Sequence, residues 1–302
     1  MFIASTAFAQ GPLTPPGAPA PTMKTLQQIE PRTPITNVPF TITQPGSYYL
    51  AANLSSTGMG ISIQTDNVAI DFNGFALSGT GPSGGNSGIL ICATGLFRGI
   101  IIRNGTIRDF VNGINSCSIN RSLFESLIMY NVFNGIILDG SNGSVSGNRV
   151  QSCQIQCSST SGGNGIIFLG GSGQVYGNQV LDNLIERGEY GIRFDGTASL
   201  INGNVVLRNQ VVDSSRNAIL MLGGHGRIED NHIFSTSATG NPIPPPGMVS
   251  TGPRNFIFNN TMSGSFLGYS LSTNDTYGPI VTSTASLSAT GIAAHARANY
   301  LR

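Results

Sequence analysis

The stretch "VYGNQVLD" (175–182) decides the fold, because four further stretches align with it without gaps. These read "VSGNRVQS" (145–152), "INGNVVLR" (201–208), "IEDNHIFS" (228–235) and "IFNNTMSG" (257–264). The first and sixth positions are apolar in every copy, and the fourth is always asparagine: Asn148, Asn178, Asn204, Asn231 and Asn260. A register of this kind indicates a solenoid in which equivalent residues stack in neighbouring coils.

A second repeat precedes these stretches and has the same period. A small residue is followed by an apolar strand seven times, beginning at Gly60, Gly88, Gly113, Gly135, Gly165, Gly191 and Ala218. The two repeats together predict an all-β parallel β-helix of about eight coils. Equivalent residues would lie about 4.8 Å apart, with Val and Ile columns inside and the asparagine column forming an amide ladder at a bend.

The chain resembles the right-handed parallel β-helix, or pectate-lyase-like, superfamily. More narrowly, it is similar to secreted bacterial β-helix repeat proteins with an "NVxIDxNG" coil, which reads "NVAIDFNG" (67–74) here. The resemblance implies a single-stranded right-handed parallel β-helix with short caps. It leaves the function open, because this architecture serves lyases, hydrolases, epimerases, adhesins and phage spikes alike.

Composition and segment boundaries favour an exported protein. Residues 1–9 have the features of a residual signal peptide, with a frayed apolar N-terminus as the alternative. Residues 10–34 form a Pro-rich linker and a possible cap helix, 35–265 the β-helix, and 266–302 a C-terminal tail or cap. No later segment has the roughly 18 apolar residues needed to span a membrane. We therefore expect a secreted or cell-surface protein.

Few residues are charged, and most of those in the later coils can be paired. Charged residues make up 10% of the chain and the formal net charge is +1, which gives no indication of a nucleic-acid partner. Aligning adjacent coils sets opposite charges against each other. The predicted ion pairs are Asp182 with Arg208, Arg187 with Asp213, and Glu189 with Arg216.

The four cysteines are expected to form two disulfides. Cys92 and Cys117 hold equal positions in adjacent coils, within the Cα separation that a disulfide allows. Cys153 and Cys157 lie together in "SCQIQC" and would form a local second bridge. A zinc site is the alternative, but no histidine lies nearby, and we expect no metal.

The outward face of the first repeated strand is unusually apolar. Since its neighbouring positions already face the interior, this stripe should be covered by the C-terminal tail, by the N-terminus or by another molecule, which would allow self-association. The stripe comprises Leu90, Ile137, Ile167, Leu169, Leu220 and Leu222.

The polar exceptions on this face are the best catalytic candidates. Asp139 and Asp195 are two coils apart, hence about 9.6 Å, near the upper limit for the carboxyl pair of inverting glycosidases. Arg193 shares their face, and His225 follows in the next turn. The alternative is that these are isolated polar residues on a sheet.

His225 lies in "GGHGRI" (223–228), which resembles two signatures of the polygalacturonases. The repeat accounts for it without catalysis, because it aligns His225 with Asn142, Ser172 and Ala198 in a turn and makes Ile228 a core residue. The Asp-Asp pair of those enzymes is absent from the chain.

A lysine-based lyase is excluded, because Lys24, outside the coils, is the only lysine. No acidic cluster stands out that would hold Ca²⁺, which enters only under a lyase alternative, and no cofactor is expected. We therefore predict a secreted, non-catalytic β-helix protein with a carbohydrate-binding, surface or assembly role, whose partner is extracellular polysaccharide or a second copy. The alternative is a polysaccharide hydrolase or lyase that uses Asp139 and Asp195, with or without His225.

Overall fold

The computed structural model describes residues 31–92, 95–141, 143–159, 162–197, 200–235, 246–264, 268–281 and 298–301. The chain divides into two compact units, Met1–Arg32 and Thr33–Arg302, and every described strand lies in the second. The predicted signal peptide and most of the linker fall on residues 1–30, outside the described residues. No α-helix occurs in the described ranges.

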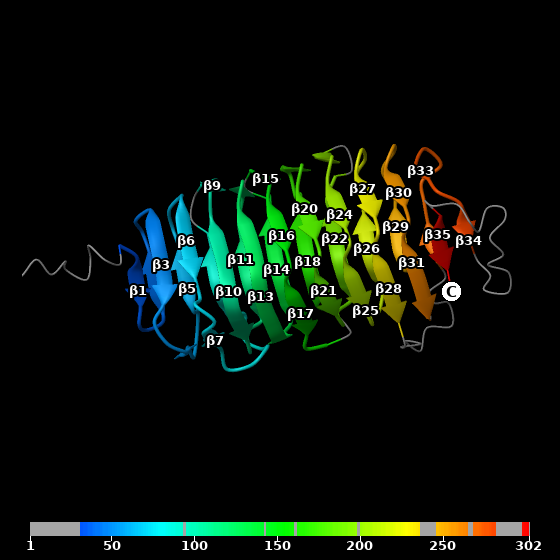
Figure 1. Cartoon of the computed structure of the whole chain (residues 1–302). Coiled ribbons are helices and arrows are strands. Elements are labelled where there is room, and N and C mark those ends of the chain that lie inside the picture. The colour runs from blue at the N-terminus through cyan, green and yellow to red at the C-terminus, as the bar shows by residue number, and fades with distance from the viewer. Residues whose placement is uncertain are drawn as a thin grey trace, which may run out of the picture. The chain divides into compact units, whose positions relative to one another are not determined.

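Three parallel sheets form the stack of coils (Figure 1). The ten strands of sheet B are β2 (Phe40–Ile42), β5 (Ile61–Ile63), β8 (Ser87–Ile91), β11 (Asn112–Ser116), β14 (Asn134–Asp139), β18 (Asn164–Leu169), β22 (Tyr190–Asp195), β26 (Asn217–Met221), β29 (Met248–Ser250) and β32 (Tyr269–Ser270). The five strands of sheet C are β9 (Phe97–Arg98), β12 (Ile119–Asn120), β15 (Ser144–Ser146), β19 (Gln174–Tyr176) and β23 (Ile201–Asn202).

Sheet A has twenty strands, because most coils contribute two strands separated by a bend. Its strands are β1 (Thr33–Ile35), β3 (Gly46–Leu50), β4 (Leu54–Ser55), β6 (Val68–Asp71), β7 (Ala76–Ser78), β10 (Ile101–Arg108), β13 (Leu123–Val132), β16 (Arg149–Gln151), β17 (Gln154–Cys157), β20 (Gln179–Leu181), β21 (Leu184–Glu186), β24 (Val205–Leu207), β25 (Gln210–Val212), β27 (Arg227–Glu229), β28 (His232–Ser235), β30 (Phe256–Phe258), β31 (Thr261–Gly264), β33 (Thr276–Tyr277), β34 (Ile280–Val281) and β35 (Asn299–Leu301).

A typical coil runs from sheet B through sheet C into the two strands of sheet A, as β14 to β17 do. Each strand then pairs in register with its counterpart one coil later, so that Ile136 lies on Ile166 and Ile166 on Ile192. The predicted parallel β-helix of about eight coils is confirmed. Close packing between coils explains the repeated small residue near the start of the sheet B strands: a Cβ on Gly165 would lie 2.5 Å from the carbonyl oxygen of Gly191.

Columns of apolar side chains fill the interior, because alternate residues of each strand point inward. Fully buried aliphatic residues stack from coil to coil, and Phe168 lies on Phe194 with ring centroids 4.4 Å apart. Outward residues are partly exposed polar or apolar side chains. Short strands of this kind cannot bury an apolar face alone, so stability comes from stacking neighbours.

The asparagines form two amide ladders rather than the single predicted column. Asn148, Asn178 and Asn204 stack at the bend between sheets C and A, and each backbone N–H and side-chain amide donates to the next Oδ1. The second ladder lies at the bend inside sheet A. It contains Asn183, Asn209, Asn231, Asn260 and Asn299.

The alignment fails from one coil onward for a structural reason. After β26 the chain reaches sheet A through Leu222–Gly226 with no strand in sheet C, where only a bridge between Asn202 and Gly224 forms. "IEDN" therefore begins in β27 of sheet A, whereas "INGN" begins in β23 of sheet C. Ile228 stacks on Val206 rather than on Ile201, although it is a core residue as predicted.

One of the two predicted disulfides forms. Cys92 and Cys117 join adjacent coils with their Cα atoms 5.1 Å apart. Cys153 and Cys157 are free and buried, so the second predicted bridge is wrong. Cys153 occupies the second ladder, and Cys157 ends β17, about 13 Å further along an extended strand, which is too far for a disulfide. Burial raises the pKa of each thiol to about 12.

Two of the three predicted ion pairs are present between adjacent coils. Arg208 Nε lies 2.7 Å from Asp182 Oδ1, and Arg216 Nη1 lies 3.0 Å from Glu189 Oε1. Arg187 and Asp213 occupy equivalent positions one coil apart, both with positive φ. The pairing predicted between their side chains stays a prediction.

The described parts of the C-terminal tail do not lie along the apolar stripe of sheet B. Strands β33, β34 and β35 instead extend sheet A, where β35 pairs with β31. Within the stripe, Ile167 is 4% and Leu220 8% exposed, and the other residues are half-buried. Residues 282–297, which also belong to the predicted cover, lie outside the described residues.

Candidate functional site

The two predicted catalytic carboxylates share a face but differ in their surroundings. Asp139 pairs in register with Leu169 and Leu169 with Asp195, so the acids are two coils apart. The carboxylate of Asp139 accepts hydrogen bonds from the backbone N–H and the hydroxyl of Ser141, at 2.8 and 2.5 Å. It thus serves as the hydrogen-bond acceptor of its own turn.

Asp195 forms an ion pair with Arg193, which neutralises it on the surface of sheet B. The guanidinium of Arg193 also lies over the Tyr190 ring, 4.4 Å from its centroid, and Arg216 approaches the same ring at 5.4 Å. Burial raises the pKa of Tyr190. This cluster engages the Asp195 carboxylate in an ion pair and leaves it next to a cation–aromatic contact rather than facing an open cleft.

His225 is not brought together with these acids. It lies in the bend that leads into sheet A, stacked after Gly203 and before Arg254, with φ 55° and an exposed side chain. His225 thus lies in a bend, as predicted, but the predicted slot beside Ser172 is wrong, because the coil lacks its sheet C strand. Asn142 and Ala198, the other residues aligned with it, lie outside the described residues.

The glycines around His225 are required by close packing. A Cβ on Gly223 would lie 2.0 Å from the carbonyl oxygen of Ile201, and one on Gly224 would lie 2.4 Å from that of Pro253. Neither glycine has a positive φ. The resemblance to a polygalacturonase signature thus reflects how tightly this coil packs on its neighbours.

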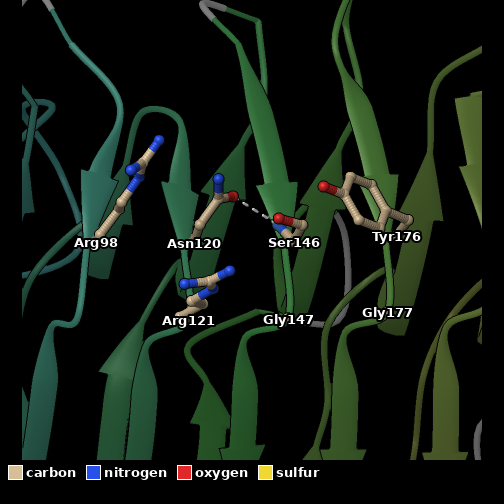
Figure 2. Close-up of a pocket in the computed structure, with 7 residues that line it drawn as sticks. All are labelled: Arg98, Asn120, Arg121, Ser146, Gly147, Tyr176 and Gly177. Atoms are coloured by element: carbon tan, nitrogen blue, oxygen red, sulfur yellow. Dashed lines mark hydrogen bonds between the residues drawn. The ribbon is translucent and has the colours of Figure 1, made fainter.

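A different part of the surface is hollowed. A depression of about 360 Å³ lies over sheet C and the following bend (Figure 2). The described residues that line it are Arg98, Asn120, Arg121, Ser146, Gly147, Tyr176 and Gly177. Among these seven there is no acid, histidine or cysteine.

Sheet C positions four of these side chains in one column. Each of its strands ends with an apolar residue that faces the core and one residue on the other face, and in this last position Arg98, Asn120, Ser146 and Tyr176 are stacked in register. Since neighbouring coils are about 4.8 Å apart, the column from Arg98 to Tyr176 is about 14 Å long. Figure 2 shows these four residues side by side on consecutive strands, with Arg121 below them at the bend.

Hydrogen bonds hold the middle of the column and leave its ends free to contact a ligand. Asn120 Oδ1 accepts the backbone N–H of Ser146 at 2.9 Å, and its amide lies 3.3 Å from Ser144 Oγ. Tyr176 is 42% exposed, and both arginines are exposed. The site therefore offers a fixed amide, an aromatic ring and two guanidinium groups on a rigid sheet.

The charge of the depression is uncompensated within the described part of the chain. Neither Arg98 nor Arg121 forms an ion pair there. Six other arginines do: Arg103, Arg108, Arg193, Arg208, Arg216 and Arg227. Asp66 is the acid that contacts this region, where it accepts the backbone N–H of Arg98 at 3.0 Å.

The repeat contained the signal for this site. Its second position reads Ser146, Tyr176 and Asn202, and its third is glycine in the same three copies. The first, fourth and sixth positions identify the core and the ladder, whereas the second gives the outward column. Arg98 and Arg121 could not be found in this way. The stretches "FRGI" (97–100) and "INRS" (119–122) do not match the repeat, because their fourth residue is Ile100 or Ser122 rather than the ladder asparagine.

A second, smaller depression of about 220 Å³ lies over the second strands of sheet A. It is lined by Ile128, Met129, Tyr130, Gln154, Gln156 and Glu186. Glu186 is the only acid among the described residues of this lining. Its carboxylate accepts a hydrogen bond from the side-chain amide of Gln156 at 3.1 Å. No group of three or more metal-ligating side chains gathers among the residues described.

Comparisons with known proteins give the fold alone. No family model matches the sequence, and no curated protein matches it significantly. The chain is similar in structure to the Dettilon tailspike protein, with a TM-score of 0.55 and 15% identity over 89% of this chain and 61% of that one. The chain thus spans about three fifths of the length of that tailspike.

Two further solved structures are less similar. A tailspike mutant of E. coli bacteriophage HK620 has a TM-score of 0.44 and 13% identity, over 82% of this chain and 57% of that one. A DFA-IIIase from Arthrobacter chlorophenolicus A6 has a TM-score of 0.43 and 12% identity, over 84% and 74%. In the described ranges, no helix has the length and hydropathy of a membrane span.

Proposed function

We propose that this protein is an exported, non-catalytic β-helix that binds polysaccharide in the depression over sheet C. The observation that carries the proposal is the lining itself, in which an exposed tyrosine, an anchored amide and two unpaired guanidinium groups occur without a carboxylate or an imidazole. Tyrosine offers a flat apolar face to a sugar ring, and amide and guanidinium groups donate hydrogen bonds to hydroxyls.

The surroundings of Asp139 and Asp195 support a non-catalytic role. An inverting hydrolase needs one carboxyl group that holds a proton and one that activates water. Asp139 is engaged by Ser141, and Asp195 is paired with Arg193. The disulfide between coils supports export, because such bonds persist in oxidising compartments.

Affinity electrophoresis in gels that contain a soluble polysaccharide tests the binding, and product analysis tests the chemistry. We expect retardation by at least one polymer in a panel of neutral and acidic bacterial and plant polysaccharides. Tyr176→Ala should weaken that binding about tenfold or more, as the loss of a central aromatic contact does. Tyr277→Ala, at an exposed tyrosine in β33, is the matched control and should bind as the wild type does.

Incubation of the same polymers with the protein should release no reducing ends and no unsaturated uronate. Release of either product, lost in Asp139→Asn or Asp195→Asn while the coils stay folded, would establish the enzymatic alternative. If Tyr176→Ala bound the polysaccharide as tightly as the wild type does, the depression over sheet C would not be the binding site.

A further inference from the structure

The bend between sheets C and A contains one residue per coil in the left-handed conformation. The residues of this bend column are Asn67, Gly99, Arg121, Gly147, Gly177, Gly203, His225 and Arg254, with φ between 52° and 67°. They stack because each of their backbone N–H groups from Asn67 to His225 donates to the carbonyl of the residue before the next member. Three successive members, Gly147, Gly177 and Gly203, carry no side chain.

Backbone conformation does not explain these three glycines. Arg121 and His225 occupy the same column with φ values of 52° and 55°. The equivalent bend inside sheet A contains Ser152, Asp182, Arg208, Asp230 and Asn259, all with φ between 53° and 56° and none of them glycine. Side chains are therefore tolerated at such bends in this protein, despite the cost that left-handed conformations impose on L-residues.

Steric crowding does not explain them either. A Cβ on Gly147 would lie 3.8 Å from the nearest other atom, and a Cβ on Gly177 or Gly203 would lie 3.9 Å away. These are ordinary van der Waals distances, unlike the contacts of 2.3–2.7 Å at the glycines that start sheet B strands from Gly60 to Gly191. The three glycines leave an open floor, here called the glycine trough, between Arg121 and His225, which are four coils and hence about 19 Å apart.

The sides of the trough are polar and basic. On the sheet C side are Ser146 and Tyr176, and on the sheet A side are Arg149 and Gln179, two residues beyond Gly147 and Gly177. Arg149 donates hydrogen bonds from Nε and Nη2 to Gln179 Oε1, at 3.0 and 2.6 Å. Its partner is therefore a neutral amide. With Arg98 and Arg121, three guanidinium groups thus lie around one end of the trough and hydrogen-bond to no carboxylate in the described structure.

We propose that the glycine trough binds a chain of carboxylated glycan, laid parallel to the direction in which the coils stack. The inference rests on the proposed function and adds to it the class of ligand and its path. Guanidinium groups match carboxylates in bidentate geometry, so Arg98 and Arg121 select uronate units. The trough gives the glycan chain room to lie against the backbone of three coils. One of its sugar rings would pack on the aromatic ring of Tyr176.

A matched pair of polymers tests the class of ligand. A polyuronate and its carboxyl-reduced, neutral form share one backbone, and we expect the polyuronate to bind at least about tenfold more tightly at low salt. The preference should shrink as salt rises, because exposed charges are screened. The double variant Arg98→Gln/Arg121→Gln should remove the preference, while Arg103→Gln, on sheet A beside Asp71, should keep it.

Blocking the trough tests the path of the chain. Gly177→Asn places in the trough the residue type that Asn67 already provides at this bend with φ 55°, so the variant should fold and unfold at nearly the wild-type temperature. Its affinity for the polyuronate should fall at least about tenfold. Gly74→Asn, at an open glycine with φ 80° in another bend, is the control and should bind normally.

The outcomes separate this inference from the proposed function. Equal affinity for the two polymers, or full affinity in folded Gly177→Asn, would overturn the inference and leave polysaccharide binding intact. Failure of every polymer in the panel to bind would overturn the proposed function, and this inference with it. A sulfated polymer bound as tightly as the polyuronate would overturn the assignment to carboxylates.

Discussion

His225 and Asn231 show how differently two polar residues of one coil contribute to the structure. The His225 side chain is exposed in a bend that accepts several residue types. Asn231 is buried, and its side-chain amide accepts hydrogen bonds from the backbone and side chain of Asn209 and donates to Asn260 Oδ1 and to the carbonyls of Val206 and Glu229. Five neighbouring groups thus contact one side-chain amide.

We expect His225→Ala to change the free energy of unfolding by no more than about 0.5 kcal/mol, as is usual for a surface substitution. Asn231→Ala should cost about 1–3 kcal/mol or more, because it leaves buried donors and acceptors without partners. Urea denaturation followed by circular dichroism measures both. Equal costs for the two variants would contradict the role assigned to the ladder.

At the scale of the element, the bend inside sheet A carries the exposed ion pair between Asp182 and Arg208. The side-chain hydrogen bond from Arg208 lowers the pKa of Asp182 in the folded protein. A carboxyl with a depressed folded pKa stabilises the fold above its unfolded pKa, about 3.9, and loses that contribution as the pH falls through the folded pKa. The pair is exposed, so its contribution is small, at most about 1 kcal/mol.

We therefore expect Asp182→Asn to lower the unfolding temperature slightly at about pH 6, and by progressively less as the pH falls below the unfolded pKa of about 3.9. Arg208→Gln should reproduce the effect at the higher pH, since it removes the same interaction. Thermal scans of the wild type and both variants across this range measure the difference. A difference independent of pH would show that the pair is not its source.

The elements also show where prediction from sequence succeeds. The first and sixth positions of the repeat identify inward residues such as Val180 and Ile228, because burial in a stack demands an apolar residue in every coil. The ladder assignment fails at Asn231 and Asn260, because both bends use a left-handed residue followed by asparagine. A local pattern cannot distinguish the bends where coils omit their sheet C strand, as those from Gly224 onward do.

Candidate sites are harder to predict than the core, because a site needs no repetition. The position of Asp139 and Asp195 on one face, two coils apart, follows from the register of the repeat, and the structure shows the same register. Their hydrogen bonds and ion pair depend on Ser141 and Arg193, which no spacing reveals. The depression over sheet C combines residues from strands and bends of four coils, so its existence depends on the stacked structure.

For the whole stack, the last coil needs its final strand. Strand β35 covers the edge of β31, and Asn299 Oδ1 accepts hydrogen bonds from the backbone and side chain of Asn260. Removal of residues 298–302 should leave those donors unpaired and expose a strand edge that can pair with another chain. We expect a lower unfolding temperature and aggregation that depends on concentration.

Light scattering over a range of concentrations measures this aggregation. The point variant Asn299→Ala keeps the strand and removes only the amide, so it should destabilise the fold with less aggregation than the truncation. A truncated protein that stays monomeric and unfolds at the wild-type temperature would contradict the capping role of β35.

The two amide ladders give the stack of coils a polarity. In every step from Asn148 to Asn204 and from Asn183 to Asn299, the earlier coil donates and the later coil accepts. The two ends of each ladder are therefore not equivalent, because every Oδ1, from the first asparagine to the last, accepts from the coil before it. Two copies that met end to end could continue the hydrogen-bond pattern only head to tail, and such contacts, which do not close, build filaments rather than dimers.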